Sequence, residues 1–158
     1  MIYETLDEAL IDISKLGTWD VDRLIKHYGI ECEYTDALPD NVNGYTFPLS
    51  KTIFVNTKAQ AKRYVKSHEF SHCLLDDTDE PLVETSMVSN SKIETRANLG
   101  AFYMMVKHYV SQTGITPNEF NILRFGEAYE LAPKYAFMAG NAAELALGIK
   151  IPKQQFYG

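Results

Sequence analysis

The sequence has only two cysteines among its 158 residues, Cys32 and Cys73, which excludes the disulfide framework of a small secreted domain. We also expect no secretory leader, because Glu4 and Asp7 stand where a leader carries bases followed by an apolar core. The longest apolar run, residues 101–106, is far too short to span a bilayer. We therefore expect a cytoplasmic protein with no membrane partner.

Positive charge is also scarce. The chain has 15 Lys and Arg against 21 Asp and Glu, a formal net charge of −6. A protein that binds nucleic acid by itself needs a basic patch to meet the phosphates. Two short helices expected at residues 5–16 and 19–28 have the spacing of a helix-turn-helix, but the second carries mixed charge. We expect no direct nucleic-acid binding, although a protein partner could itself bind DNA.

The hydrophobic pattern alternates between helical and strand periods along the chain. It predicts a mostly helical α+β fold with a small three-stranded antiparallel or mixed sheet just before the central helix. Helices are expected at residues 5–16, 19–28, 60–75, 92–111 and 133–147, with a shorter one after Pro117. Strands are expected at residues 30–34, 44–47 and 52–56, an acidic loop at 76–90, and an extended surface tail at 149–158.

The length suits a single domain with its own core. No linker, repeat or low-complexity tract divides the chain. We expect one domain over residues 1–158, built from N-terminal helices at 1–29, a small sheet at 30–56, a central helical part at 58–112 and a C-terminal helical part at 115–158.

The most informative stretch is His68-Glu69-Phe70-Ser71-His72, an H-E-x-x-H pattern inside an expected helix. Two histidines four residues apart lie one turn apart on the same helix face, so both can bind one Zn²⁺ ion. The glutamate between them is then placed to act as the general base toward a water molecule. The alternative is that the pattern arises by chance. Its helical context favours a metal site.

Two histidines leave a catalytic zinc site one protein ligand short. A known arrangement places a third histidine six residues after the second, but that position holds Thr78. Asp76 lies one helical step after His72, yet on a continued helix it stands about 80° away from the direction of His68. Glu94 is the better candidate, because it begins a separate helix that can cross the first one at the metal.

The face of that second helix also suits Glu94 as a ligand. Ala97 and Ala101 are small, so they would let the two helices approach closely, and Asn98 could hydrogen-bond a metal ligand from outside the coordination sphere. The alternative is that Glu94 only completes a capping box with Ser91 and that the alanines serve ordinary helix packing.

The expected strand at residues 52–56 has a possible functional reading. A sheet edge beside a metal site can hold an extended peptide by backbone hydrogen bonds. We take this strand as the candidate substrate edge, with an ordinary structural hairpin as the alternative. Its residues are Ile53, Phe54, Val55 and Asn56.

Several short motifs together resemble the ImmA/IrrE family of metallopeptidases. The resemblance covers roughly residues 20–105, and its most specific part is the combination of H-E-x-x-H with E-x-x-A-N. The pieces occur in the family's order: Gly29-Ile30, Val42-Asn43-Gly44-Tyr45, Thr52-Ile53-Phe54-Val55-Asn56, His68-Glu69-Phe70-Ser71-His72 and Ile93-Glu94-Thr95-Arg96-Ala97-Asn98. The chain departs from the family at residues 99–106, where no proline follows, and matches no named pattern after Gly114.

The resemblance implies a minimal zincin-like domain in which His68, His72 and Glu94 bind Zn²⁺ and Glu69 is the catalytic base. It also implies a zinc-dependent endopeptidase whose substrate is a cytoplasmic helix-turn-helix repressor of a phage or mobile element. Two alternatives remain open. One is a module of the same fold that inactivates a repressor by docking without cutting it. The other is a domain with structural zinc only, although such zinc is usually enclosed by four protein ligands.

Overall fold

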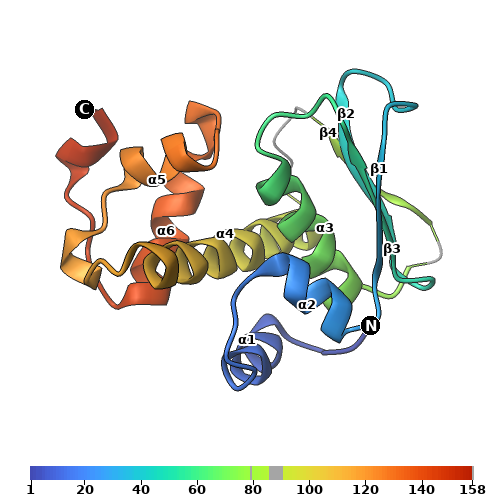
Figure 1. Ribbon diagram of the computed structural model, residues 1–158, viewed down its shortest axis with the longest axis horizontal. Coiled ribbons are helices and arrows are strands. Elements are labelled where there is room, and N and C mark those ends of the chain that lie inside the picture. Colours follow the sequence, from blue (N-terminus) through green and yellow to red (C-terminus); the bar gives the residue numbers. More distant parts are fainter. Residues whose placement is uncertain (79, 86–90, 158) are drawn as a thin grey trace.

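The computed structural model describes residues 1–78, 80–85 and 91–157. A long helix, α4, runs across the molecule and joins a sheet-and-helix part to a set of C-terminal helices (Figure 1). The elements are α1 (Leu6–Ser14), α2 (Val21–His27), β1 (Glu31–Thr35), β2 (Val42–Phe47), β3 (Thr52–Asn56), α3 (Lys62–Leu75), β4 (Leu82–Thr85), α4 (Lys92–Thr113), η1 (Pro117–Glu119), α5 (Ile122–Ala128), η2 (Pro133–Tyr135), α6 (Ala136–Leu147) and η3 (Lys153–Tyr157).

The mostly helical α+β fold predicted from the sequence is confirmed, but the sheet is larger than expected. Within the described residues it has four strands in the order β1-β3-β2-β4, with β1 parallel and β2 antiparallel to β3. The fourth strand, β4, pairs with β2 and lies inside the stretch expected to be an irregular loop. The other parts of that loop at residues 79 and 86–90 lie outside the described residues.

The prediction that residues 52–56 form a sheet edge for substrate binding is wrong. β3 is an interior strand, paired on one side with β1 and on the other with β2, so Ile53 faces Cys32 and Thr46 at once. An interior strand has no free backbone groups to add a peptide by strand pairing. The edges of the sheet are β1 and β4.

One face of the sheet packs on α3, and none of the helices in the described residues covers the other (Figure 1). The inward face is lined by Gly44, Thr46, Ile53 and Val55, all of them buried. Because side chains alternate along a strand, the outward face carries aromatic rings, including Phe54, which stacks on its neighbour in β2. The sheet therefore forms a single layer whose inner face supports the helix that carries the two histidines.

Helix α3 is buried almost completely from Ser67 to Leu75, because β2 and β3 cover one side and α4 covers another. The approach of α4 is close at Gly100, where an added Cβ atom would lie 2.9 Å from the hydroxyl oxygen of Ser71. Ala97 and Ala101 are buried on the same helix, as the expected small face requires. Small residues thus bring the two helices within reach of a shared site.

The C-terminal half of α4 packs against α6, and α5 packs beside α6. The prediction of an extended surface tail at residues 149–158 is wrong in part. Residues Lys153–Tyr157 form η3, and the Phe156 ring covers Gly140 of α6, where an added Cβ atom would lie only 2.7 Å away. Ile151 is buried too. None of the described helices is both long and apolar enough to cross a membrane.

Replacing Gly44 by alanine tests the close packing of β2 against α3. The added Cβ atom would lie 2.7 Å from the backbone oxygen of Phe54 and 2.9 Å from Val65 Cγ1. We expect Gly44→Ala to lower the free energy of unfolding by about 1–3 kcal/mol, measured by chemical denaturation. Gly126→Ala is the control, because nothing lies within 4 Å of its added methyl group. That change should be neutral or stabilise α5 by about 0.5–1 kcal/mol.

Candidate metal centre

Three side chains from two helices converge on one point. His68 and His72 come from adjacent turns of α3, and Glu94 comes from the first turn of α4. The two Nε2 atoms lie 3.1 Å apart, and the Glu94 carboxylate lies 2.8 Å from that of His68 and 3.2 Å from that of His72. Among the described residues, these three form the one group whose ligand atoms could hold a metal ion.

The donor separations suit a small divalent cation. Ligand atoms about 2.0–2.1 Å from zinc at tetrahedral angles stand about 3.3 Å apart. The observed separations of 2.8–3.3 Å lie close to that value without rearrangement. Two imidazoles and one carboxylate form the donor set of catalytic zinc sites, and similar ions accept the same ligands. His68, His72 and Glu94 therefore fit a metal ion, as the sequence predicted.

Asp76 supports the metal centre without being a ligand. Its carboxylate accepts a hydrogen bond from His72 Nδ1 at 2.8 Å, so the neutral form of the ring would keep its proton on Nδ1 and offer Nε2 to a metal. The prediction that Asp76 is not a ligand agrees with its absence from the three-residue group, but the angular reason was wrong. Helix α3 ends at Leu75, and Asp76 is its C-cap in extended conformation.

Arg96 holds Asp76 in place from the other helix. Its Nη2 atom donates to Asp76 Oδ1 at 2.7 Å and to the backbone oxygen of Leu75 at 3.2 Å. Arg96 lies two residues after Glu94 on α4. The same turn of this helix therefore supplies a candidate metal ligand and the arginine that holds Asp76, the hydrogen-bond partner of His72. Sequence reasoning missed this contact. The four-residue spacing from His72 to Asp76 was its only local signal.

His68 is supported by a second polar chain. Asn98 lies beside His68 and acts to raise the pKa of that histidine, and its Oδ1 atom accepts a hydrogen bond from the Tyr64 hydroxyl at 2.5 Å. Asn98 was predicted to hydrogen-bond a metal ligand; it lies beside the ligand His68, and the hydrogen bond itself stays a prediction. Tyr64 was not predicted; it lies one turn before His68, on the same face of α3.

Glu69 is fully buried on the side of α3 that faces the sheet. The Thr46 hydroxyl on β2 donates a hydrogen bond to its Oε2 atom. Close packing makes this contact possible, since a Cβ atom on Gly44 would come within 3.6 Å of Glu69 Cγ. Thr46 was not identified from the sequence, because nothing local links a strand residue to a helix 23 positions later.

The four residues proposed as the substrate edge have structural positions instead. Ile53 and Val55 are fully buried between the sheet and α3, and Phe54 belongs to the outer aromatic face. The Asn56 amide donates to the backbone oxygens of Pro39 and Val42. Asn56 thereby fixes the turn before β2, and none of the four contributes to the metal centre.

The electrostatics of the metal-free centre favour one proton shared among its ligands. Burial lowers the pKa of His68. Burial also acts to lower the pKa of His72, but hydrogen bonds with Asp76 and Glu94 outweigh it and raise that pKa to about 9. For Glu94, burial acts to raise the pKa, yet hydrogen bonds with the two histidines lower it to about 2. The cluster thus contains one carboxylate and one imidazolium near neutral pH.

No family model, curated protein or solved structure matches this chain.

Changing Asp76 to asparagine tests the support of His72. Asparagine keeps the size of the side chain but loses the negative charge that holds the Nδ1 proton and pairs with Arg96. We expect zinc affinity, measured by competition with a chromophoric chelator, to fall about 10- to 100-fold. Asp40→Asn is the matched control, since that carboxylate is exposed and pairs with Lys58 away from the metal centre. Equal affinities for the two variants would contradict this role of Asp76.

Zinc binding should also release a proton. With a pKa of about 9, His72 is protonated at pH 7 in the metal-free protein, whereas a metal ligand must be the neutral imidazole. The low pKa of Glu94 and the lowered pKa of His68 leave those two groups without a proton to release.

We expect about one proton to be released per zinc ion at pH 7, and affinity to rise about tenfold per pH unit up to pH ~9. Calorimetric titration in buffers of different ionisation enthalpy measures this release. A binding enthalpy that does not depend on the buffer would contradict a protonated His72.

Proposed function

We propose that this protein is a zinc-dependent endopeptidase. The observation that carries the proposal is the convergence of His68, His72 and Glu94 within hydrogen-bonding distance of one another, with Glu69 between the two histidines on the same helix. Three protein donors are the number that a catalytic zinc site uses, which leaves a position for water or substrate. The resemblance of these motifs to the ImmA/IrrE metallopeptidases supports the same reaction.

The residues of this site have separate tasks in peptide hydrolysis. A bound zinc ion would supply Lewis acidity, which polarises a peptide carbonyl and lowers the pKa of water. Glu69 takes the proton from the attacking water at its carboxylate and passes it to the leaving amine, so one water molecule is consumed for each peptide bond broken. Thr46 orients the Glu69 carboxylate through its hydrogen bond.

The buried supports of the two histidines keep the ligands in position before metal or substrate arrives. Asp76 and Asn98 each contact a ring that is at most 1% exposed. Because these partners come from the end of α3 and from α4, the ligands need little rearrangement to bind a metal. Glu94 is the more accessible ligand, with 15% of its side chain exposed, so water and substrate would approach the site from its side.

The proposed substrate is a cytoplasmic helix-turn-helix repressor of a phage or mobile element, and its cleavage would release the repressed genes. This assignment rests on the family resemblance. The net charge of −6 is compatible with it, because a DNA-binding substrate carries a basic surface that an acidic protein attracts. The same charge argues against direct binding of the DNA.

The burial of Glu69 favours a second candidate function. Its side chain has no solvent exposure, and Thr46 occupies one of its oxygen atoms. A base that must take a proton from water needs contact with that water. If water does not reach Glu69, the protein would work as an anti-repressor that inactivates its partner by docking. The metal would then stabilise the fold.

The Glu69→Gln variant separates the two functions. Glutamine keeps the shape and can still accept the hydrogen bond from Thr46, but it cannot hold a proton. We expect repressor cleavage, followed by gel electrophoresis and mass spectrometry, to fall by at least about 10³-fold, an estimate at the lower end for a general base. Zinc content and melting temperature should stay unchanged, because Glu69 is not one of the three ligands.

The substrate to use is a purified helix-turn-helix repressor of a phage or mobile element, with chelator-treated wild-type protein as a second control. Fragments that disappear in both the variant and the chelated sample support the peptidase. Loss of repressor activity that survives Glu69→Gln and produces no fragments overturns the peptidase in favour of docking.

A further inference from the structure

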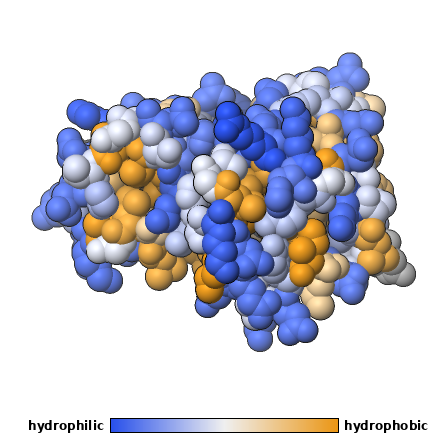
Figure 2. Space-filling model, turned by 60° about the horizontal axis from the view of Figure 1, so that its bottom comes forward, coloured by the Kyte–Doolittle hydropathy of each residue, from blue (hydrophilic) through white to orange (hydrophobic). Residues whose placement is uncertain are grey.

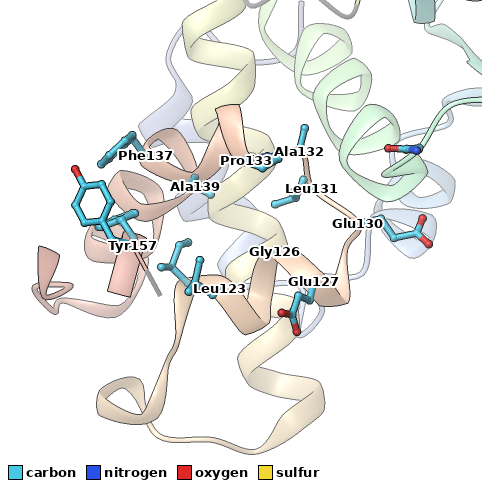
Figure 3. A pocket seen from close by; sticks show the side chains of 14 residues that line it. Leu123, Gly126, Glu127, Glu130, Leu131, Ala132, Pro133, Phe137, Ala139 and Tyr157 are labelled. Atoms are coloured by element: carbon cyan, nitrogen blue, oxygen red, sulfur yellow. The ribbon is translucent and has the colours of Figure 1, made fainter. Parts of the chain in front are cut away.

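A large cavity lies in the C-terminal helical part, away from the metal centre. Its volume is about 600 Å³, within the 300–1,000 Å³ range usual for ligand pockets. Helix α5, the segment before α6, α6 itself and η3 surround it (Figure 3). Apolar surface gathers over these helices at the left of Figure 2. The apolar lining includes Ile122, Leu123, Leu131, Ala136, Phe137 and Phe156.

The cavity has one apolar end and one acidic end. Phe137 and Tyr157 lie at one end, and Glu127 and Glu130 lie at the other (Figure 3). The two glutamates are the charged residues of the lining, and both are exposed. Within residues 1–78, 80–85 and 91–157, neither carboxylate is in an ion pair. An occupant that fits both ends has an apolar part and a positive charge.

Glu130 has an unusual backbone conformation. Its φ angle is +57°, in the left-handed region that costs a non-glycine residue about 1 kcal/mol or more. Glycine is favoured at such a position, so the glutamate side chain is kept at the expense of stability. Strained residues of this kind often occur where a side chain has a function.

The acidic end of the cavity leads toward the helix of the metal centre. A second cavity of about 260 Å³ shares Gln60, Glu130 and Ala132 with the first one and is also lined by Tyr64 and Val65 of α3. Tyr64 belongs to the polar chain that supports His68. The shared lining residues make the two cavities neighbours along one path from the C-terminal helices to α3.

The lining of the smaller cavity includes lysines as well as the glutamate that it shares with the larger cavity. Lys58 is paired with Asp40 at 3.3 Å, and the Lys134 ammonium lies 5.3 Å from the centre of the Tyr135 ring. The acidic character therefore belongs to the larger cavity. The larger cavity therefore favours a positively charged occupant, whereas both acidic and basic residues line the path toward α3.

We propose that the larger cavity is a docking site for a basic amphipathic segment of the protein substrate, outside the stretch that is cut. Apolar side chains of this segment would fill the space beside Leu123 and Phe137, and its Lys or Arg residues would face Glu127 and Glu130. The substrate chain would continue past Gln60 toward α3. This inference rests on the proposed function for the identity of the partner, but the binding itself requires neither metal nor Glu69.

A binding experiment with the full-length Glu69→Gln protein tests the docking site independently of cleavage. The probe is a fluorescein-labelled peptide of about 14 residues with leucines on one helical face and lysines on the other. One control peptide carries glutamates in place of the lysines, and another carries serines in place of the leucines. Fluorescence anisotropy should show saturable binding of the leucine–lysine peptide and at least about tenfold weaker binding of both controls.

Variants in the same background locate the binding. Glu130→Gly should raise the melting temperature by about 1–3 °C, because it relieves the left-handed backbone, and yet weaken peptide binding about threefold. Adding Glu127→Gln should bring the loss to about tenfold. Lys51→Gly is the matched control, since Lys51 has a φ angle of +51° in the β2–β3 turn, far from the cavity. It should give the thermal gain with no loss of binding.

A cavity-filling variant, Ala136→Phe, tests the apolar end and should also abolish binding in a protein that still melts cooperatively. Binding that is insensitive to both Glu130→Gly and Ala136→Phe, or equal binding of the acidic control peptide, overturns the docking site. So does the absence of binding by the leucine–lysine peptide. These results are distinct from failure of the peptidase proposal, which would appear as absence of repressor cleavage while the peptide still binds.

Discussion

The close contact between α3 and α4 is the constraint on which the candidate site depends. Both histidines lie on α3, so the third ligand can reach them only if α4 begins beside that helix. Gly100 permits this approach, because any larger residue would meet the Ser71 hydroxyl. On the opposite side of α3, Gly44 allows β2 to approach in the same way. The absence of a side chain at these two positions therefore lets the helix that carries the histidines pack closely between the sheet and a second helix.

Such tight packing removes polar groups from water, and the structure compensates for that cost. A buried polar or charged group destabilises a fold by several kcal/mol unless it has partners. Here His72 is paired with Asp76 and Glu94, His68 with Glu94, and Glu69 with Thr46. The same contacts that offset desolvation also fix the orientation of the rings. Stability of the core and preorganisation of a metal site are consequently served by one set of hydrogen bonds.

Helix α4 connects two regions with different tasks. Its first turn supplies Glu94 and Arg96 to the metal centre, and its C-terminal half packs against α6, which lines the large cavity. In the proposed peptidase, the N-terminal two-thirds of the chain would hold the reacting groups and the C-terminal helices would hold the substrate. A rigid helix shared by both regions fixes the distance between them, so a docked segment would present a defined part of its chain to the metal.

Features that depend on the local period of the residues could be predicted before the fold was known. The four-residue spacing of His68 and His72 placed them on one helix face, and Glu94 followed from the start of the next helix and its small residues. Most helices and three strands were likewise found from periodicity. Tertiary structure alone decided the rest. The four-residue strand β4 forms where β2 offers it an edge, and the parallel pairing of β1 with β3 places β3 inside the sheet. Thr46 and Arg96 reach the site through packing between elements distant in the chain. Spacing along a sequence encodes which residues share a face, whereas the partner of that face is chosen only when the whole core is assembled.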